Sequence, residues 1–269
     1  MRILFLGTAS GAGKTTLAAM YCRHLARTGV DAVPFKASNL STRSHRTADG
    51  GEIGIGQLIQ ARAAGAEPAA DMNPVLLRPR GGGVVETVVR GVPADGPVGR
   101  EALGDIVAAA YDRLAAAHGA VVCEGSGSPA ELNLIDRDLA NVGLLRMRPM
   151  PAVLVGDIER GGVFAAVYGT WLLMPADVRP LLKGFVINRF RGDPSILGDG
   201  IERIEELTGM PCLGVMPFTE VALPEEDSCR DAPDGTATDT AWTEELDRLL
   251  DAAAANGFDP GRIDAIARG

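Results

Sequence analysis

The sequence feature that most constrains the fold of this chain is a glycine-rich run that follows a short apolar stretch near the N-terminus. Residues 2–6 read Arg-Ile-Leu-Phe-Leu, and residues 7–16 read Gly-Thr-Ala-Ser-Gly-Ala-Gly-Lys-Thr-Thr. Apolar side chains recur at helical spacing over residues 15–28, which predicts a helix directly after the run. A strand, a glycine-rich turn and a helix in this order are typical of a phosphate-binding loop, in which backbone N–H groups surround the phosphates. We therefore predict an α/β fold in which this loop binds a nucleoside triphosphate.

The individual loop residues predict how the triphosphate is held. Lys14 is expected to reach the β- and γ-phosphate oxygens, and the Thr15 hydroxyl to ligate Mg²⁺. The residues assigned to nucleotide binding are Thr8, Ala9, Ser10, Gly11, Ala12, Gly13, Lys14, Thr15 and Thr16. The run is a variant of the Walker pattern, because Thr8 stands where the first glycine is expected and Gly7 lies one residue earlier. A surface turn that merely looks similar is the alternative, and the flanking strand and helix argue against it.

Composition and charge exclude several classes of protein. The chain has 269 residues, of which 46% are hydrophobic and 23% charged, so one large α/β domain or two small ones would fit. The formal net charge of −9 argues against a nucleic-acid partner, whose phosphates require clustered Lys and Arg. The four cysteines form no C-x-x-C pair, which argues against a zinc site and a disulfide framework. The same cysteine pattern fits the reducing cytoplasm, where we expect the protein. No apolar run reaches the ~20 residues that span a bilayer, and we expect no membrane partner.

Apolar strand-like runs alternate with helical segments along the chain, which is typical of a parallel sheet covered by helices. The runs cover residues 3–6, 31–35, 120–123, 152–155, 184–187 and 212–216. The helical segments between them lie near residues 56–64, 100–117, 163–171 and 201–208. The expected fold class is α/β, a P-loop NTPase with a mostly parallel sheet flanked by helices on both faces.

Polar residues follow the carboxyl ends of the predicted strands, where ligands bind in sheets of this kind. Lys36 follows the second strand and can neutralise phosphate charge, and Glu124 follows the third, where P-loop enzymes place the carboxylate that meets Mg²⁺. Asp49 is a further candidate ligand; a solvated surface position is the alternative for it and for Lys36. We therefore predict catalytic roles for Lys14, Lys36, Asp49 and Glu124. Mg²⁺ is expected on Thr15, Asp49 and Glu124.

The fifth predicted strand ends in Asn188 and Arg189, which we assign to the nucleotide base. An amide offers a donor and an acceptor to a purine edge, and a turn-forming asparagine is the alternative. Arg191 stands where guanine-specific P-loop proteins carry an aspartate, and a guanidinium cannot accept the N1 and N2 protons of guanine. The expected nucleotide is therefore ATP.

A series of ordered motifs between residues 1 and 228 matches one known family. The motifs are Lys36-Ala37 with Asn39, residues 47–54, residues 71–77, Glu124-Gly125 with residues 128–131, Arg137-Asp138 with Ala140-Asn141, Asp157 with residues 160–164, residues 184–193 and residues 223–228. Together they resemble cobyric acid synthase (CobQ-like), a family related in fold to dethiobiotin synthetase and to the MinD/ParA ATPases. The resemblance implies a carbon–nitrogen ligase of cobalamin biosynthesis, an amidotransferase that amidates peripheral carboxylates of a corrin ring with ammonia drawn from glutamine.

The resemblance also implies a mechanism and a substrate site. ATP would phosphorylate a carboxylate, and ammonia would displace phosphate from the acyl phosphate. Residues 1–228 would form the ATP-dependent synthetase domain. The residues implied to face the corrinoid are Asn39, Glu52, Asn73, Asp157, Arg160, Gly161 and Gly162.

The chain departs from the family pattern after residue 228. Residues 229–241 are predicted to be a polar linker and residues 242–269 a helical tail, whose apolar stripe from Trp242 to Ala253 must be buried on the chain itself or on a partner. Family members carry a glutaminase domain here, whose nucleophilic Cys sits in a Gly-flanked elbow with His and Glu partners. None of the four cysteines has such flanking glycines, and all three histidines precede this point. We therefore expect no intrinsic glutaminase, and ammonia that is free or comes from a separate glutaminase subunit.

Two other functions remain possible alternatives. A homodimer is also a possible assembly. One is a MinD/ParA-like ATPase switch that binds a partner instead of making product, although such proteins carry an early loop lysine where this chain has Ala9. The other is a ligase that acts on another tetrapyrrole or on a small carboxylate substrate. Phosphate release that depends on a substrate would distinguish an enzyme from a switch. Activity assays with a set of different corrinoids would distinguish a corrinoid ligase from a ligase for another substrate.

Overall fold

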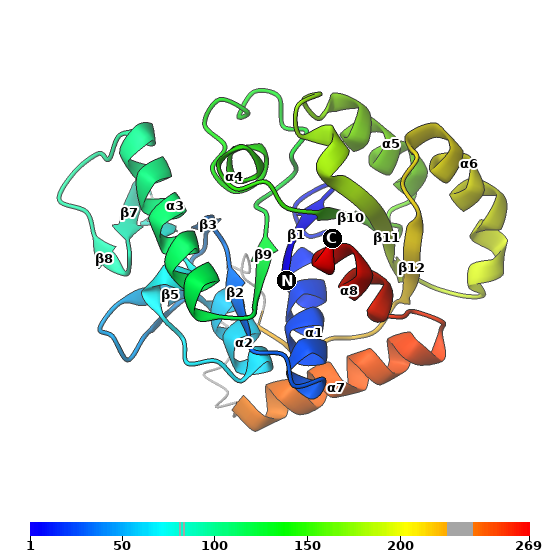
Figure 1. The fold of residues 1–269 in the computed structure, drawn as a ribbon, viewed down its shortest axis with the longest axis horizontal. Helices are drawn as coiled ribbons and strands as arrows, with labels where there is room; N and C mark the ends of the chain where they lie inside the picture. Colours follow the sequence, from blue (N-terminus) through cyan, green and yellow to red (C-terminus); the bar gives the residue numbers. More distant parts are fainter. Residues whose placement is uncertain (81, 83, 225–238) are drawn as a thin grey trace. The chain divides into compact units, whose positions relative to one another are not determined.

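The fold contains a six-stranded sheet (Figure 1). The structure, a computed structural model, describes residues 1–80, 82, 84–224 and 239–269. The strands of this sheet are β1 (Arg2–Gly7), β2 (Ala32–Phe35), β9 (Ala120–Glu124), β10 (Ala152–Asp157), β11 (Leu182–Phe190) and β12 (Cys212–Pro217). Their order is β12-β11-β10-β1-β9-β2, and β1 pairs with β10, β10 with β11, β11 with β12 and β2 with β9 in parallel. The predicted α/β class with a mostly parallel sheet is confirmed, and each predicted strand is present.

The central strands β1 and β10 are continuous apolar runs because successive side chains point to opposite faces and both faces are covered. In β1, Leu4, Phe5 and Leu6 are all 0% exposed. The run from Val153 to Val155 in β10 is equally buried. Burial of consecutive residues, rather than of every second one, explains why these two strands could be recognised in the sequence.

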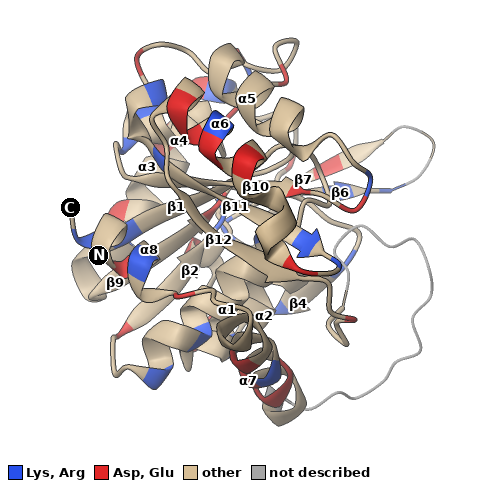
Figure 2. Cartoon of the chain, turned by 90° about the vertical axis from the view of Figure 1, so that its right-hand side faces the viewer, with Lys and Arg blue, Asp and Glu red and all other residues tan. Residues whose placement is uncertain are grey.

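Helices accompany the sheet at the places where the sequence predicts them, with α4 in addition. They are α1 (Lys14–Arg27), α2 (Ile55–Ala64), α3 (Arg100–Ala117), α4 (Val142–Met147), α5 (Val163–Leu173), α6 (Gly198–Thr208), α7 (Asp239–Ala255) and α8 (Gly261–Arg268). α5 carries no charged side chain, and Figure 2 shows it uncoloured beside the acidic turns of α6. α1 begins at Lys14, directly after the glycine-rich loop.

Two small sheets between β2 and α3 were not predicted. One consists of β3 (Ser38–Leu40), β6 (Val75–Pro79), β7 (Val85–Val89) and β8 (Val92–Pro93), and the other pairs β4 (Ser44–Arg46) with β5 (Glu52–Gly54). These strands are short, and several of their residues are polar or exposed. β3, β4, β5 and β8 are therefore too short to show a pattern, and β7 interrupts its valines with Glu86 and Thr87. β6 does begin with an apolar run, Val75 to Leu77, which was not predicted to be a strand.

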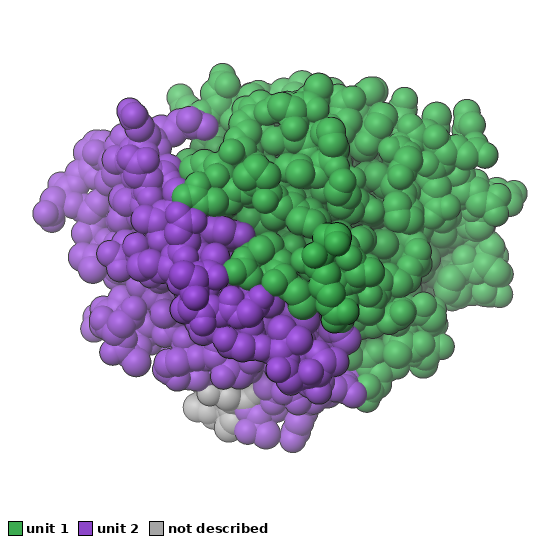
Figure 3. Space-filling view, viewed as in Figure 1, with its two compact units in different colours: residues 1–17, 125–220, 248–269 green, residues 18–124, 221–247 purple. Residues whose placement is uncertain are grey.

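The chain divides into two compact units, shown in Figure 3. Unit 1 comprises residues 1–17, 125–220 and 248–269, and contains β1, β10, β11 and β12 with α4, α5, α6 and α8. Unit 2 comprises residues 18–124 and 221–247, and contains β2, β9 and both small sheets with α2 and α3. The predicted linker over residues 229–241 falls, up to residue 238, outside the described residues.

The predicted apolar stripe near the C-terminus lies on α7 and is buried. Trp242, Leu246, Leu249, Leu250 and Ala253 of α7 are between 0% and 8% exposed, so the chain itself covers the stripe. Within the described ranges, none of the helices combines the length and the apolar character that crossing a membrane requires.

Candidate functional site

The loop between β1 and α1 turns through two glycines in unit 1. Gly11 and Gly13 have φ values of 71° and 96°, in the left-handed region that residues with a side chain rarely adopt. Lys14 is 6% exposed, and its Nζ donates to the carbonyl oxygens of Ala9 at 3.0 Å and Gly127 at 2.9 Å. Carbonyl oxygens thus hold the ammonium at the loop, and phosphate oxygens are acceptors of the same kind with a stronger charge.

The end of β11 is tied to the same loop. Asn188 donates from Nδ2 to the carbonyl oxygen of Ala12 at 2.9 Å, while its Oδ1 accepts from the backbone N–H of Arg189 at 2.9 Å. A Cβ atom on Gly13 would lie 2.0 Å from Asn188 Nδ2, so this close approach requires glycine. Arg189 has a φ of 63°, a strained conformation for a residue with a side chain, and its guanidinium donates to Asp157 Oδ2 at 2.8 Å. The structure therefore brings Asn188, Arg189 and Asp157 together beside the loop.

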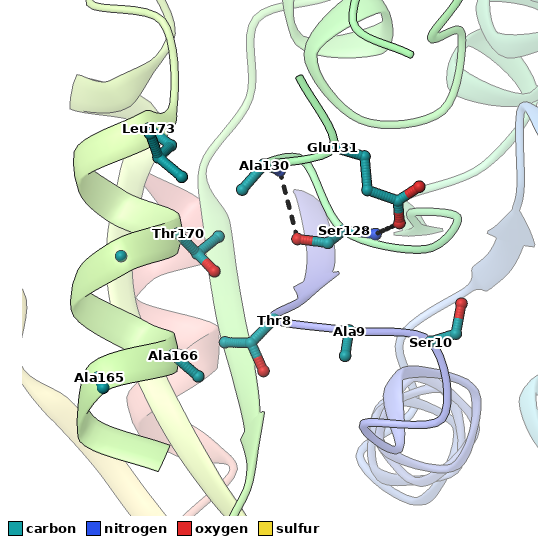
Figure 4. A pocket seen from close by; sticks show the side chains of 11 residues that line it. Thr8, Ala9, Ser10, Ser128, Ala130, Glu131, Ala165, Ala166, Thr170 and Leu173 are labelled. Atoms are coloured by element: carbon teal, nitrogen blue, oxygen red, sulfur yellow. Dashed lines mark hydrogen bonds between the residues drawn. The ribbon is translucent and has the colours of Figure 1, made fainter. Parts of the chain in front are cut away.

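A pocket of about 570 Å³ opens next to the start of the loop, also within unit 1 (Figure 4). Its lining residues come from the loop, from the segment after β9 and from α5; they are Thr8, Ala9, Ser10, Ser128, Ala130, Glu131, Ala165, Ala166, Gly169, Thr170 and Leu173. Ser128 N donates to Glu131 Oε1 at 2.9 Å, which folds that segment along the pocket. Two of the predicted substrate residues, Gly161 and Gly162, precede α5 in left-handed conformations, and Arg160 beside them is exposed.

In unit 2, Lys36 and Glu124 form a buried ion pair. The two residues are 3% and 0% exposed, and Lys36 Nζ donates to Glu124 Oε1 at 2.9 Å. Gln60 of α2, also 0% exposed, donates from Nε2 to Glu124 Oε2 at 2.6 Å. Burial raises the pKa of the nearby Cys22 thiol, and the charge of Glu124 raises it further. Two of the predicted catalytic residues, which lie 88 positions apart in the chain, therefore meet out of solvent.

Two predicted substrate residues stabilise the backbone and side chains around this pair. Asn73, 0% exposed, donates from Nδ2 to the carbonyl oxygen of Lys36 at 3.0 Å and accepts at Oδ1 from Gly54 N at 3.1 Å. Asn39 donates to Gln57 Oε1 at 3.0 Å, and both side chains are buried. Lys36, Asn39 and Asn73 thus belong to one buried polar region of unit 2.

The remaining predicted residues of unit 2 have other partners. Asp49 accepts from Thr47 Oγ1 and from the backbone N–H groups of Gly51 and Ala70, and these hydrogen bonds, led by that of Thr47, hold the pKa of Asp49 below its usual range. Glu52 accepts from Ser44 Oγ and, at 2.7 Å, from the guanidinium of Arg78. In the part of unit 2 that the structure describes, the hydrogen bonds given for Asp49 close its own loop and tie that loop to Ala70; none of them joins it to Lys36 or Glu124.

Sequence reasoning missed the two glutamines of α2. Gln57 and Gln60 lie three residues apart, which places them on one side of a helix. They are buried in a segment whose neighbours Leu58, Ile59 and Ala61 are apolar. Two polar residues at helical spacing within an apolar helix were the available signal, because a buried amide must find a hydrogen-bond partner.

The donor chemistry of these residues fits Mg²⁺ bound together with a nucleotide. Among the described residues there is no group of three or more His, Cys, Asp and Glu side chains that could hold a metal ion. Mg²⁺ needs no such group, because it usually keeps several waters and takes one or two carboxylates in addition to substrate phosphates. Glu124 offers one carboxylate and Thr15 one hydroxyl, and both are the hard oxygen donors that this ion prefers.

Comparisons with known proteins agree with this architecture. Two relatives named probable cobyric acid synthase are similar in sequence: one from Methanoculleus marisnigri is 50% identical over 235 residues, which cover 85% of this chain and 48% of that protein. The other, from Methanoregula boonei, is 51% identical over 239 residues, covering 85% of this chain and 49% of that protein. The chain therefore spans about half the length of the curated relatives it matches.

The fold and the family are shown by two further comparisons. A chain of the MinC:MinD cell division protein complex from Aquifex aeolicus superposes with a TM-score of 0.53 at 15% identity, covering 98% of this chain and 96% of that one, which shows a shared fold. The family model CbiA, described as the CobQ/CobB/MinD/ParA nucleotide binding domain, matches residues 3–228. Because that match takes in Lys14, Lys36, Glu124 and most of the rest of the chain, the chain belongs to the CobQ/CobB/MinD/ParA nucleotide-binding domain family.

Proposed function

We propose that this chain carries out the ATP-dependent amidation of carboxylates on a corrinoid, as the synthetase part of a cobyric acid synthase-like ligase. The observation that carries the proposal is the 50% identity to probable cobyric acid synthases over 85% of the chain. The phosphate-binding loop and the buried Lys36–Glu124 pair supply groups that this chemistry needs.

The chemistry follows from the weakness of a carboxylate as an electrophile. A carboxylate oxygen attacks the γ-phosphorus of ATP, the bond to the β–γ bridging oxygen breaks, and ADP leaves. Ammonia then attacks the acyl carbon of the acyl phosphate; phosphate departs, and the nitrogen loses a proton to give the amide. Positioning and charge neutralisation provide most of the rate enhancement in phosphoryl transfer.

The residues of the chain are suited to these tasks. Lys14 would neutralise the β- and γ-phosphates, and Lys36 would stabilise the charge that develops on the transferred phosphoryl group. Thr15 and Glu124 would hold Mg²⁺, which supplies further charge neutralisation when bound, while Asn188 and Arg189 would contact the adenine. Asp49 remains a proposed ligand, and its present hydrogen bonds to Thr47, Gly51 and Ala70 would have to be exchanged for it to bind the ion.

The nitrogen source is also part of the proposal. Ammonia, either free or released by a separate glutaminase subunit, is the nucleophile. The experiment uses the purified chain with ATP, Mg²⁺, ammonium salts and a corrinoid that carries free peripheral carboxylates. We expect amide formation and one phosphate released per amide, faster as pH rises because more NH₃ is present. Phosphate release that is the same with and without the corrinoid would contradict the assignment.

The fold likeness to the MinC:MinD complex favours one second candidate, an ATPase switch. Such a switch would associate into dimers on adding ATP and would release phosphate without forming product. Sedimentation measures whether the chain forms dimers, and it is carried out with ATP, with ADP and without nucleotide. ATP-specific dimers without amide product under any of the conditions above would favour the switch over the ligase.

A further inference from the structure

The carboxylate of Glu124 is held from two directions by side chains of different elements. Lys36, just after β2, donates to Oε1 at 2.9 Å, and Gln60 of α2 donates to Oε2 at 2.6 Å. The three residues are at most 3% exposed. Each oxygen of this carboxylate thus has its own buried donor, and the direction of the carboxylate is fixed by both.

The two donors differ in how they respond to a bound ligand. The Lys36 ammonium is a charge on a flexible four-carbon stem, so an incoming phosphate attracts it and a cation on Glu124 repels it. The Gln60 amide is neutral, and a cation on the carboxylate does not drive it away. Of these two hydrogen bonds to Glu124, the one from Gln60 is therefore the one that can persist when a metal–nucleotide complex is bound.

The position of Gln60 also calls for an explanation in terms of Glu124. α2 buries Leu58, Ile59 and Ala61 around it, and an apolar side chain would pack in such surroundings at no desolvation cost. A buried amide is favourable only where it makes hydrogen bonds, and the bond from its Nε2 goes to Glu124. α2 thus presents an amide at the point where the carboxylate needs a neutral donor.

We propose that Gln60 is a positioning residue, which acts through Glu124 by keeping one carboxylate oxygen occupied and the other directed at the cation of a metal–nucleotide complex. This proposal rests on the proposed role of Glu124 in holding Mg²⁺, but it requires neither a corrinoid nor amide formation. Groups that hold a metal-ligating side chain in place typically contribute 10–100-fold in metal affinity or activity.

The test compares Gln60→Met with Gln57→Met. Both residues are 0% exposed glutamines on α2, and methionine matches glutamine in length and flexibility while it removes the amide. Affinity of the full chain for Mn²⁺ in the presence of ADP is measured by electron paramagnetic resonance, and ADP affinity in excess chelator by calorimetry. For Gln60→Met we expect Mn²⁺ affinity to fall about 10-fold or more, with ADP affinity in chelator within about twofold of the parent. For Gln57→Met we expect Mn²⁺ affinity to stay within about twofold.

A second substitution isolates the route through Glu124. In a Glu124→Gln background, Gln60→Met is expected to cause no further loss of Mn²⁺ affinity, because the group that it positions is gone. If Gln60→Met does not fold, Gln60→Asn, which keeps the amide but withdraws it by one methylene, is expected to show the same selective loss. Equal losses of Mn²⁺ affinity in the Gln60 and Gln57 variants, or an unchanged Mn²⁺ affinity in Gln60→Met or Gln60→Asn, would overturn the proposal. Failure of the corrinoid reaction alone would leave these binding results unaffected and would count only against the proposed function.

Discussion

The phosphate-binding loop of unit 1 and the Lys36–Glu124 cluster of unit 2 are built in different ways. The loop depends on backbone conformation over a few consecutive residues, with Gly11 and Gly13 in left-handed conformations. The cluster depends on buried side chains that are distant in sequence, since Gln60 and Glu124 are 64 positions apart. A site made by backbone conformation accepts few residue types at each position, but its residues are close together in the sequence. A site made by buried side chains is stabilised because opposite charges neutralise each other. The two regions should therefore fail in different ways when they are altered.

The largest expected effect is on the stability of the cluster. Glu124→Leu leaves the Lys36 ammonium buried without its carboxylate, and breaking a buried pair in this way typically costs about 3–5 kcal/mol. The double variant Lys36→Met with Glu124→Leu removes both charges and is expected to regain most of that free energy of unfolding. Urea denaturation of the parent, the single and the double variant measures the difference. A double variant no more stable than the single one would show that uncompensated charge is not the cause.

At the loop, removal of the Lys14 side chain should instead abolish function with little loss of stability. Lys14→Ala removes the ammonium that is expected to meet the phosphates, and we expect ATP-dependent phosphate release to fall about 100-fold or more. Lys183→Ala, at an exposed lysine of β11, is the matched control. Calorimetric titration with ATP and a phosphate-release assay check both variants. If Lys14→Ala bound and hydrolysed ATP as well as the unaltered chain, the assignment of the loop to the nucleotide site would be wrong.

Two glycines of the loop allow a sharper comparison within unit 1. Gly13→Ala places a Cβ 2.0 Å from Asn188 Nδ2 in addition to straining the backbone, whereas at Gly11 no atom lies within 4 Å of the added Cβ. We expect Gly11→Ala to cost about 1 kcal/mol of stability from its positive φ alone, and Gly13→Ala to cost about 2–3 kcal/mol and to weaken ATP binding. Thermal unfolding and calorimetric titration with ATP of the two variants test this difference. Equal behaviour would mean that Asn188 does not constrain the loop.

The smallest expected effect is the loss of stability in acid to which two aspartates of unit 2 contribute. The guanidinium groups of Arg113 and then Arg90 hold the pKa of Asp71 below its usual range, and that of Arg23 does the same for Asp247. Because both pKa values are lower in the folded chain, the stabilisation is present above the ordinary aspartate pKa of about 3.9 and is lost as pH falls through the folded values.

Melting temperatures measured between pH 2 and pH 6 should therefore fall at the acid end. Asp71→Asn, which cannot titrate, should lower the melting temperature at pH 6 and flatten the profile. A profile of the same slope in Asp71→Asn and in the parent would assign the acid sensitivity to other groups.

The contrast between the two regions also explains how much could be predicted. The loop, β1 and α1 follow one another in the chain, so local pattern was enough to place Lys14 and the large sheet. Glu124 and Lys36 were identified as candidates because each ends a strand. Their contact with each other and with Gln60 arises only when β2, β9 and α2 pack, and no local pattern records that. Most strands of the small sheets are only two or three residues long, so their pairing partners define them and no local pattern does; β6, which begins with the apolar run Val75 to Leu77, is the exception that sequence reasoning overlooked.

Arg189 carries a consequence for how this protein can change by mutation. Its left-handed backbone would be relaxed by Arg189→Gly, which costs nothing at positive φ. The same change removes the guanidinium that pairs with Asp157 beside the loop. At this single position, relief of backbone strain and loss of the Arg189–Asp157 ion pair therefore act on the free energy of unfolding with opposite signs, so exchange for glycine offers less than its φ alone would suggest.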